Sequence, residues 1–399
     1  MSEQSRRAFV ASGIGAALMS RSLMSYASAS RSDGSVKVPT DQAIRQLLEQ
    51  RVNGEKRTIG TAVCVVQPDS SRVITVGRER LTNDRPVTSN TVFEIGSITK
   101  IFTALLFADM VRRGQVKLDD PVSRHLPSDF HVPEMNGRKI TLTDLATHTS
   151  GMPRFPTFPG TPLSPAWKEA IPLFTLDQFK AWVAAMRPET IPPTAAGWWY
   201  SNAGYTLLAM ALANRGGRSY EAMLQERVIG PLGLKDTTLH PTATMRSRLA
   251  ESHDSNLKPI PPTELGIFIG GGGLLSTPRD LSRFATKILS DSGSAIARDN
   301  QLLLSVQRPA PWIGGKQALG WEIRDAQGGA FVSKDGVTWG QAASMVFDRE
   351  GRTAIIVFSN AAPDMRSSTL SGGGIGAADI AQHLLRPAIP LAGQGGTNY

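Results

Sequence analysis

The sequence predicts an α/β (more narrowly α+β) fold, in which one antiparallel sheet flanked by helices carries an inserted all-helical lobe. Strand-like runs occur near both ends of the chain, whereas helical patterns dominate between about residues 120 and 290. A chain of 399 residues is also long enough for one extended sheet with an insertion. The 41% hydrophobic and 19% charged residues are typical of a folded globular protein.

The first 29 residues have the pattern of an export signal. Arg6 and Arg7 form a twin-arginine pair, an apolar run follows, and Ala27-Ser28-Ala29 resembles a cleavage site. We expect cleavage after Ala29 and a periplasmic or secreted protein. The apolar run is too short to span a bilayer comfortably, so we expect no membrane span after cleavage; an uncleaved anchor is the alternative.

One catalytic domain is expected to follow the signal. Its two lobes are predicted from the strand-rich and helix-rich stretches. The predicted bounds are 36–390 for the domain, about 40–95 and 300–390 for the sheet lobe, and about 115–290 for the helical lobe.

The sheet lobe begins with a helical pattern over 41–52 and two strand patterns over 60–67 and 71–78. Cys64 lies in the apolar run of the first strand and is the only cysteine, so no internal disulfide can form. We expect Cys64 to be a core residue and not a nucleophile.

From Ser97 the sequence pattern predicts a long helix, which is expected to end at Arg112, Arg113 and Gly114. Its residues are apolar on several faces, which predicts that the helix is buried. Ser97 lies in its first turn. Later helices and strands follow in order, with helices expected over 141–148, 176–186, 202–217, 220–230 and 278–289, strands over 318–325, 329–336, 339–348 and 353–360, and a last helix over 376–385.

A serine followed three residues later by a lysine on a helix places both side chains on one face, with Cβ atoms roughly 5–6 Å apart. The amine can then accept the serine proton. The pattern occurs twice, at Ser97 and Lys100 and at Ser255 and Lys258. The second copy runs directly into Pro259, which disfavours a helix, so we select the first.

Two further patterns follow in order: Tyr200-Ser201-Asn202, and then Lys334-Asp335-Gly336. The ordered set resembles the serine β-lactamases and penicillin-binding proteins, especially class C β-lactamases and their D,D-peptidase and esterase relatives. Further similar stretches extend the resemblance over roughly residues 40–385. It implies a β-lactamase/transpeptidase-like fold.

The resemblance also implies roles for the residues. Ser97 is the nucleophile, and Lys100 and Tyr200 share its proton. Asn202 holds Lys100 and donates to the substrate, and Lys334 helps to lower the pKa of Tyr200 and attracts a substrate carboxylate. The backbone N–H groups of Ser97 and Val337 form the oxyanion hole.

Two positions depart from the family pattern. Ser201 stands where class C β-lactamases commonly have alanine, and Asp335 stands where a hydroxyl residue usually helps to bind the substrate carboxylate. An aspartate facing that carboxylate would repel it, unless strand alternation aims Asp335 elsewhere.

Other chemical signals are weaker. His148 is expected to be a structural histidine at a helix end rather than a general base, and Trp198 and Trp199 are either cleft wall or packing. The glycines of 270–273 are read as a tight turn with a purely conformational role. No spacing of histidine or cysteine indicates a metal, and no cofactor is expected.

The formal charge of +9 is spread along the chain without a basic run, so nucleic acid is not expected as a partner. The sequence predicts an exported serine hydrolase that acts on β-lactams or on D-alanyl peptides from peptidoglycan. A carboxylesterase of the same fold, or a protein that binds penicillin without turnover, are the alternatives. The oligomeric state is left open.

Overall fold

The computed structural model describes residues 36–391 except 136, 157–169, 188–196, 291–292, 327–328, 349, 351–352 and 364–375. The predicted export signal over 1–29 lies outside these residues. No helix of the described part combines the length and apolarity needed to cross a membrane.

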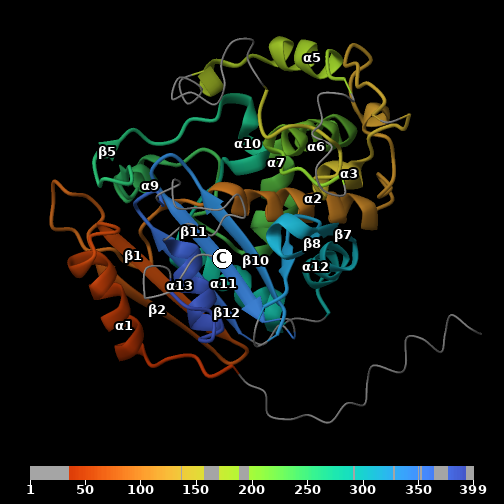
Figure 1. Ribbon diagram of the computed structural model, residues 1–399. Coiled ribbons are helices and arrows are strands. Elements are labelled where there is room, and N and C mark those ends of the chain that lie inside the picture. The colour runs from red at the N-terminus through yellow and green to blue at the C-terminus, as the bar shows by residue number, and fades with distance from the viewer. Residues whose placement is uncertain are drawn as a thin grey trace, which may run out of the picture. The chain divides into compact units, whose positions relative to one another are not determined.

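An eight-stranded sheet forms the centre of the domain, and every neighbouring pair in it is antiparallel. Its order, β2-β1-β12-β11-β10-β9-β8-β7, joins strands from both ends of the chain, as predicted (Figure 1). The strands are β1 Gly60–Gln67, β2 Ser70–Gly77, β7 Gln307–Ala310, β8 Gly315–Ala318, β9 Glu322–Arg324, β10 Phe331–Val337, β11 Ala342–Asp348 and β12 Ala354–Ser359.

Both faces of the sheet are covered, and the alternation along β1 explains why its sequence is apolar throughout. Val63 and Val65 face the core under α1 (Asp41–Glu49) and α13 (Ala377–Leu385). Cys64 faces the opposite core, together with residues of α2 (Thr99–Arg112) and α11 (Pro278–Ser290). Cys64 is fully buried, and burial raises its pKa to about 12, as suits the predicted core residue.

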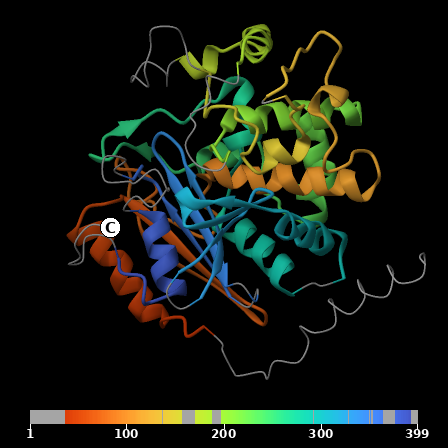
Figure 2. The same cartoon turned by 45° about the vertical axis from the view of Figure 1, so that its right-hand side comes forward.

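The helices that build the second lobe lie beyond one end of the sheet (Figure 2). The helices that follow one another along this part of the chain are α2 Thr99–Arg112, α3 Leu142–Ala146, α5 Leu176–Ala184, α6 Asn202–Gly216, α7 Tyr220–Leu224, α8 Gly230–Leu232, α9 Ala243–Ser247 and α10 Ile269–Gly272. Two more helices come after them, α11 Pro278–Ser290 and α12 Ala295–Ser305. Nearly all of α2 is buried, as its many apolar faces predicted, because it packs against α6, α10 and α12.

Three details differ from the sequence-based expectations. α11, which the sequence grouped with the helical lobe, packs against β1 and β12 and so covers the sheet. α12 and β7 were not expected at all. Two small antiparallel pairs also form: β3 (Phe93–Glu94), which lies in the stretch 91–96 expected to be extended, pairs with β6 (Leu275–Ser276), and β4 (Ser252–His253) pairs with β5 (Pro259–Ile260). The strands β4, β5 and β6 were not expected, because such short segments have no strand periodicity.

Candidate active site

Ser97 lies where the sheet and the helical lobe meet. It belongs to a 3-10 turn, Gly96–Ile98, that leads directly into α2, so it stands at the start of the buried helix as predicted. Gly96 has a φ of 47°, and a Cβ there would lie 2.8 Å from Val337 N. Only glycine combines that backbone with such a close neighbour. The turn can therefore bring Ser97 against the end of β10.

The same reasoning explains the glycine of the Lys-x-Gly pattern. A Cβ on Gly336 would lie 2.0 Å from Ile95 O and 3.1 Å from Ser97 N. The absence of a side chain thus lets β10 run beside the Ser97 turn. The backbone nitrogens of Ser97 and Val337, the predicted oxyanion-hole donors, consequently come from two adjacent segments.

Lys100 lies one helical turn after Ser97 and is fully buried. Its Nζ donates to Ser97 Oγ at 3.2 Å, to Asn202 Oδ1 at 2.6 Å and to Gly271 O at 2.5 Å. Three acceptors use all three N–H groups of an ammonium and fix its position. The predicted contact between Asn202 and Lys100 is present.

Tyr200 comes from a segment 103 residues away, and its Oη donates to Ser97 Oγ at 2.5 Å. Two cations lie close to its ring, with Lys100 Nζ 4.8 Å and Lys334 Nζ 5.0 Å from the centroid. The Arg154 guanidinium lies 5.6 Å from the same ring. Three positive charges therefore surround one phenol.

These charges set the protonation chemistry of the site. Burial lowers the pKa of Lys100 to about 8. Burial alone would raise the pKa of Tyr200, but Lys100, Lys334 and Arg154 lower it to about 8. The two groups touch and titrate in the same range, so the pair loses a proton near pH 8 and can then accept the Ser97 proton.

Lys334, on β10, does not contact Ser97. Its Nζ is buried and donates to Glu322 Oε1 at 2.8 Å. Glu322 also accepts from Arg324 at 2.7 Å, and these two cations lower the pKa of Glu322 to about 2 against the effect of burial. The charge of Lys334 is therefore paired within the protein.

Asp335 points to other partners. Its carboxylate accepts from Ser344 Oγ at 2.6 Å and lies 3.4 Å from Arg324 Nη2. The carboxylate of Asp335 is therefore directed at Ser344 and Arg324, which agrees with the alternative in which strand alternation aims Asp335 away from a substrate carboxylate.

The segment carrying Tyr200 is fixed by its neighbours. Ser201 caps α6, since its Oγ accepts from Gly204 N at 2.8 Å and donates to Pro153 O at 2.7 Å. His148 is fully buried directly after α3 with a φ of 60°, and its Nδ1 accepts from Ser201 N at 3.1 Å. Its ring packs on Tyr200 at 4.4 Å between centroids, and burial lowers its pKa well below the usual value.

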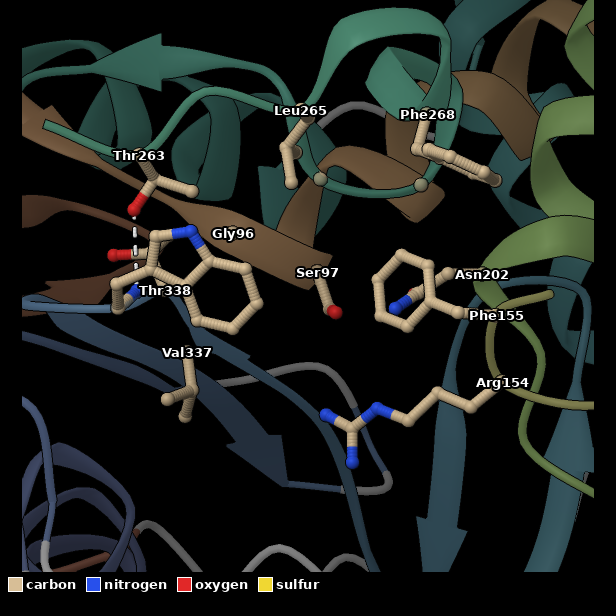
Figure 3. A pocket seen from close by; sticks show the side chains of 13 residues that line it. Gly96, Ser97, Arg154, Phe155, Asn202, Thr263, Leu265, Phe268, Val337 and Thr338 are labelled. Carbon is tan, nitrogen blue, oxygen red and sulfur yellow. Dashed lines mark hydrogen bonds between the residues drawn. The ribbon is translucent and has the colours of Figure 1, made fainter. Parts of the chain in front are cut away.

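A cleft of about 460 Å³, counting the space open to solvent, leads to Ser97. Leu265 and Phe268 form one wall, Arg154, Phe155 and Asn202 a second, and Val337 and Thr338 at the end of β10 a third (Figure 3). Trp339 also lines the cleft. Ser97 Oγ points into the space between these walls.

Sequence reasoning missed several groups at this site. Glu322 lies in one of the stretches that resemble the family, but it was assigned no role, and Arg324 and Arg154 carried no chemical signal. The glycine run over 270–273 was read as a turn without further role, but it forms the helical turn α10, and Gly271 O holds Lys100. No side-chain pattern reveals a carbonyl acceptor.

The remaining candidates lie elsewhere. Ser255 and Lys258 form a turn in which Leu257 has a φ of 62°, so this copy of the pattern is not helical. Trp198 packs on Ala310 and Ile313, and its Nε1 lies 3.4 Å from Gln317 Oε1, so it is a packing residue. Among the described residues no cluster of histidine, cysteine or carboxylates could hold a metal.

Known proteins similar to this chain share its fold. The sequence profile of the beta-lactamase family matches residues 40–373. Two solved structures superpose well: a class C beta-lactamase from Rhodobacter sphaeroides (TM-score 0.70, 22% identity, 87% of this chain and 99% of that chain) and a beta-lactamase/D-alanine carboxypeptidase from Yersinia pestis (0.69, 24%, 87% and 100%).

Two curated relatives are similar in sequence. The D-alanyl-D-alanine-carboxypeptidase/endopeptidase AmpH of Escherichia coli (strain K12) is 33% identical over 231 residues, which are 58% of this chain and 57% of the relative. The chain thus matches little more than half the length of that relative. A beta-lactamase of Pseudomonas fluorescens is 27% identical over 292 residues, 70% of this chain and 74% of the relative.

Proposed function

The chain belongs to the beta-lactamase family, and from that premise we propose that it is an exported serine hydrolase that forms an acyl-enzyme on Ser97. The observation that carries the proposal is the position of Ser97 Oγ, which accepts hydrogen bonds from both Lys100 Nζ and Tyr200 Oη. A serine hydroxyl is a weak nucleophile unless a neighbouring base takes its proton, and these are two such groups.

In the proposed acylation, Ser97 Oγ attacks the carbonyl carbon of an amide or lactam, and its proton passes to the Lys100 and Tyr200 pair. The developing oxyanion is stabilised by the N–H groups of Ser97 and Val337, each donor contributing about 3–4 kcal/mol. The proton then passes to the leaving nitrogen as the C–N bond breaks. Water attacks the ester in the second half, with the same pair as base.

D-alanyl peptides are the first proposed substrate, because the relative with 33% identity is a D-alanyl-D-alanine carboxypeptidase. β-Lactams, the substrates of the other relatives, acylate the same serine in this proposal. Asn202 would donate its side-chain N–H to the acyl-side carbonyl, while its Oδ1 stays on Lys100. The twin-arginine pattern at Arg6 and Arg7 supports export to a compartment that contains peptidoglycan.

The test is to incubate the mature protein with nitrocefin, with a peptide ending in D-Ala-D-Ala and with p-nitrophenyl acetate, and to follow product and intact mass. We expect turnover and an adduct on wild type, and neither on Ser97→Ala. Ser255→Ala is the matched control, because it removes the serine of the second Ser-x-x-Lys pattern, and it should behave as wild type.

Other outcomes would identify the alternatives. Turnover of the acetate ester alone would point to an esterase. A penicillin adduct that persists without product would point to a binding protein. Activity lost in Ser255→Ala but kept in Ser97→Ala would reverse the assignment.

A further inference from the structure

The active-site cleft contains one side chain, Arg154, whose charge helps to lower the pKa of Tyr200 but has no ionic partner among the described residues. Arg154 is the only formally charged residue among the described residues that line the cleft, and no carboxylate lines it. Its side chain is exposed, and within the described part of the chain its guanidinium has no carboxylate or other hydrogen-bond acceptor. The ring of Tyr200 is its recorded partner.

We propose that Arg154 binds the carboxylate of the substrate, on the leaving-group side of the bond that Ser97 attacks. This inference rests on the proposed function and names the ligand group that the site selects. A guanidinium presents a fork of N–H donors that matches a carboxylate in a bidentate pair, and such charge-assisted bonds are among the stronger ones in proteins.

Lys334 is poorly suited to that task in this chain. Its side chain is 1% exposed, and its Nζ donates to Glu322, which also accepts from Arg324. A carboxylate reaching Lys334 would have to compete with a buried carboxylate already in place. Arg154, in contrast, can meet an anion without breaking an ion pair.

The position of Arg154 fits the geometry of the reaction. Its guanidinium lies against the ring of Tyr200, whose hydroxyl is 2.5 Å from Ser97 Oγ. In Figure 3 it extends from its wall of the cleft into the space below Ser97, toward the Val337 side. The terminal carboxylate of a D-Ala-D-Ala peptide lies one residue, about 3.6 Å, beyond the bond that breaks. The apolar wall of Leu265 and Phe268, on the other side of Ser97 from the guanidinium, is left for the acyl part, and Asn202, at the level of Ser97, can still donate to the acyl-side carbonyl (Figure 3).

The first experiment measures binding without turnover. Titrate Ser97→Ala and Ser97→Ala/Arg154→Gln with a peptide ending in D-Ala-D-Ala and with the same peptide as its C-terminal carboxamide. We expect the first protein to prefer the carboxylate, and the second to lose about tenfold to a hundredfold of that preference, the usual value of a hydrogen bond to a charged group. Arg154→Lys should restore part of it, since the charge remains but the fork is lost.

The second experiment compares kcat/KM on wild type, Arg154→Gln and Arg279→Gln. Arg279 is an exposed arginine on α11 that does not line the cleft, so it is the matched control. The substrates are the peptide pair and a second pair, benzylpenicillin and its methyl ester, which show whether a peptide or a β-lactam supplies the carboxylate. In Arg154→Gln, kcat/KM should fall selectively for the substrate of each pair that has a free carboxylate, and the fall should come from a higher KM.

Equal losses on both members of each pair would overturn the proposal, because Arg154 would then act only through the pKa of Tyr200. An unchanged carboxylate preference in Ser97→Ala/Arg154→Gln, or no preference in Ser97→Ala, would also overturn it. Failure of wild type to turn over any substrate, with the preference of Ser97→Ala intact, would instead reject the proposed function.

Discussion

Glu322 and Lys334 form a buried ion pair with a distance of 2.8 Å, and this pair supports the positive field around Tyr200. Without a partner, the ammonium of a lysine side chain that is only 1% exposed would tend to lose its proton. Instead, although burial opposes it, Glu322 raises the pKa of Lys334. The catalytic role proposed for Tyr200 therefore depends on a carboxylate that does not contact Ser97.

Glu322→Gln should destabilise the protein by about 3–5 kcal/mol at pH 7, because it leaves a buried cation without its partner. The folded-state pKa of Glu322, about 2, is below its ordinary 4.5, so the stabilisation is complete above pH 4.5 and lost as pH falls through 2. Urea unfolding should show a smaller difference in free energy of unfolding between wild type and Glu322→Gln at pH 3 than at pH 7. The double variant Glu322→Gln/Lys334→Met should be more stable than Glu322→Gln. If the losses in free energy of unfolding of the two single variants simply added up in the double variant, the two side chains would not be paired.

Tyr200→Phe should lower kcat/KM for acylation by about 10²–10⁴, because the ring stays in place while the hydroxyl that contacts Ser97 is lost. Nitrocefin hydrolysis and the rate of adduct formation measure the effect. The stability of the variant should change little by comparison, and an acylation rate within a factor of two of wild type would remove Tyr200 from the mechanism.

The antiparallel sheet built from both ends of the chain could be predicted from the sequence, because alternation and apolar runs indicate burial directly, but the order of its strands was not predicted. The three motifs could also be found, since each needs particular residue types at short spacing. Glu322 and Arg154 could not, because their roles depend on which distant residue lies opposite them. β7 and α12 were missed since four-residue strands and a helix with a short apolar stripe give little periodic signal.

The pH dependence of acylation should report the Lys100 and Tyr200 pair. Each has a pKa of about 8, so the form able to accept the Ser97 proton is scarce at pH 6 and abundant above pH 8. We expect kcat/KM to rise by about tenfold per unit at low pH and to level off near pH 8. Stopped-flow acylation across pH 5.5–9 would show it, whereas a flat profile would contradict the assigned base.

Gly96→Ala should be far more harmful than Gly314→Ala, although both glycines have positive φ values of 47° and 67°. A Cβ on Gly314 meets nothing within 4 Å, so that variant should lose only about 1 kcal/mol of stability and keep its kcat. A Cβ on Gly96 meets Val337 N at 2.8 Å and would push Ser97 away from β10. A shift of about 1 Å can cost about 100-fold in kcat/KM. Equal activities of the two variants would show that the close approach is unimportant.

His148 allows a test of which group is the base. Its Nδ1 accepts from Ser201 N, and its pKa is well below 6.5, so it should stay neutral over the range in which activity rises. His148→Asn keeps an acceptor at the same position and suits the φ of 60°, whereas His148→Phe leaves the Ser201 N–H buried without a partner, which costs about 1–3 kcal/mol. Both variants should retain the rise in kcat/KM toward pH 8, with lower kcat and stability in His148→Phe. Loss of that rise in His148→Asn would make His148 the titrating base and reduce Tyr200 to a hydrogen-bond donor.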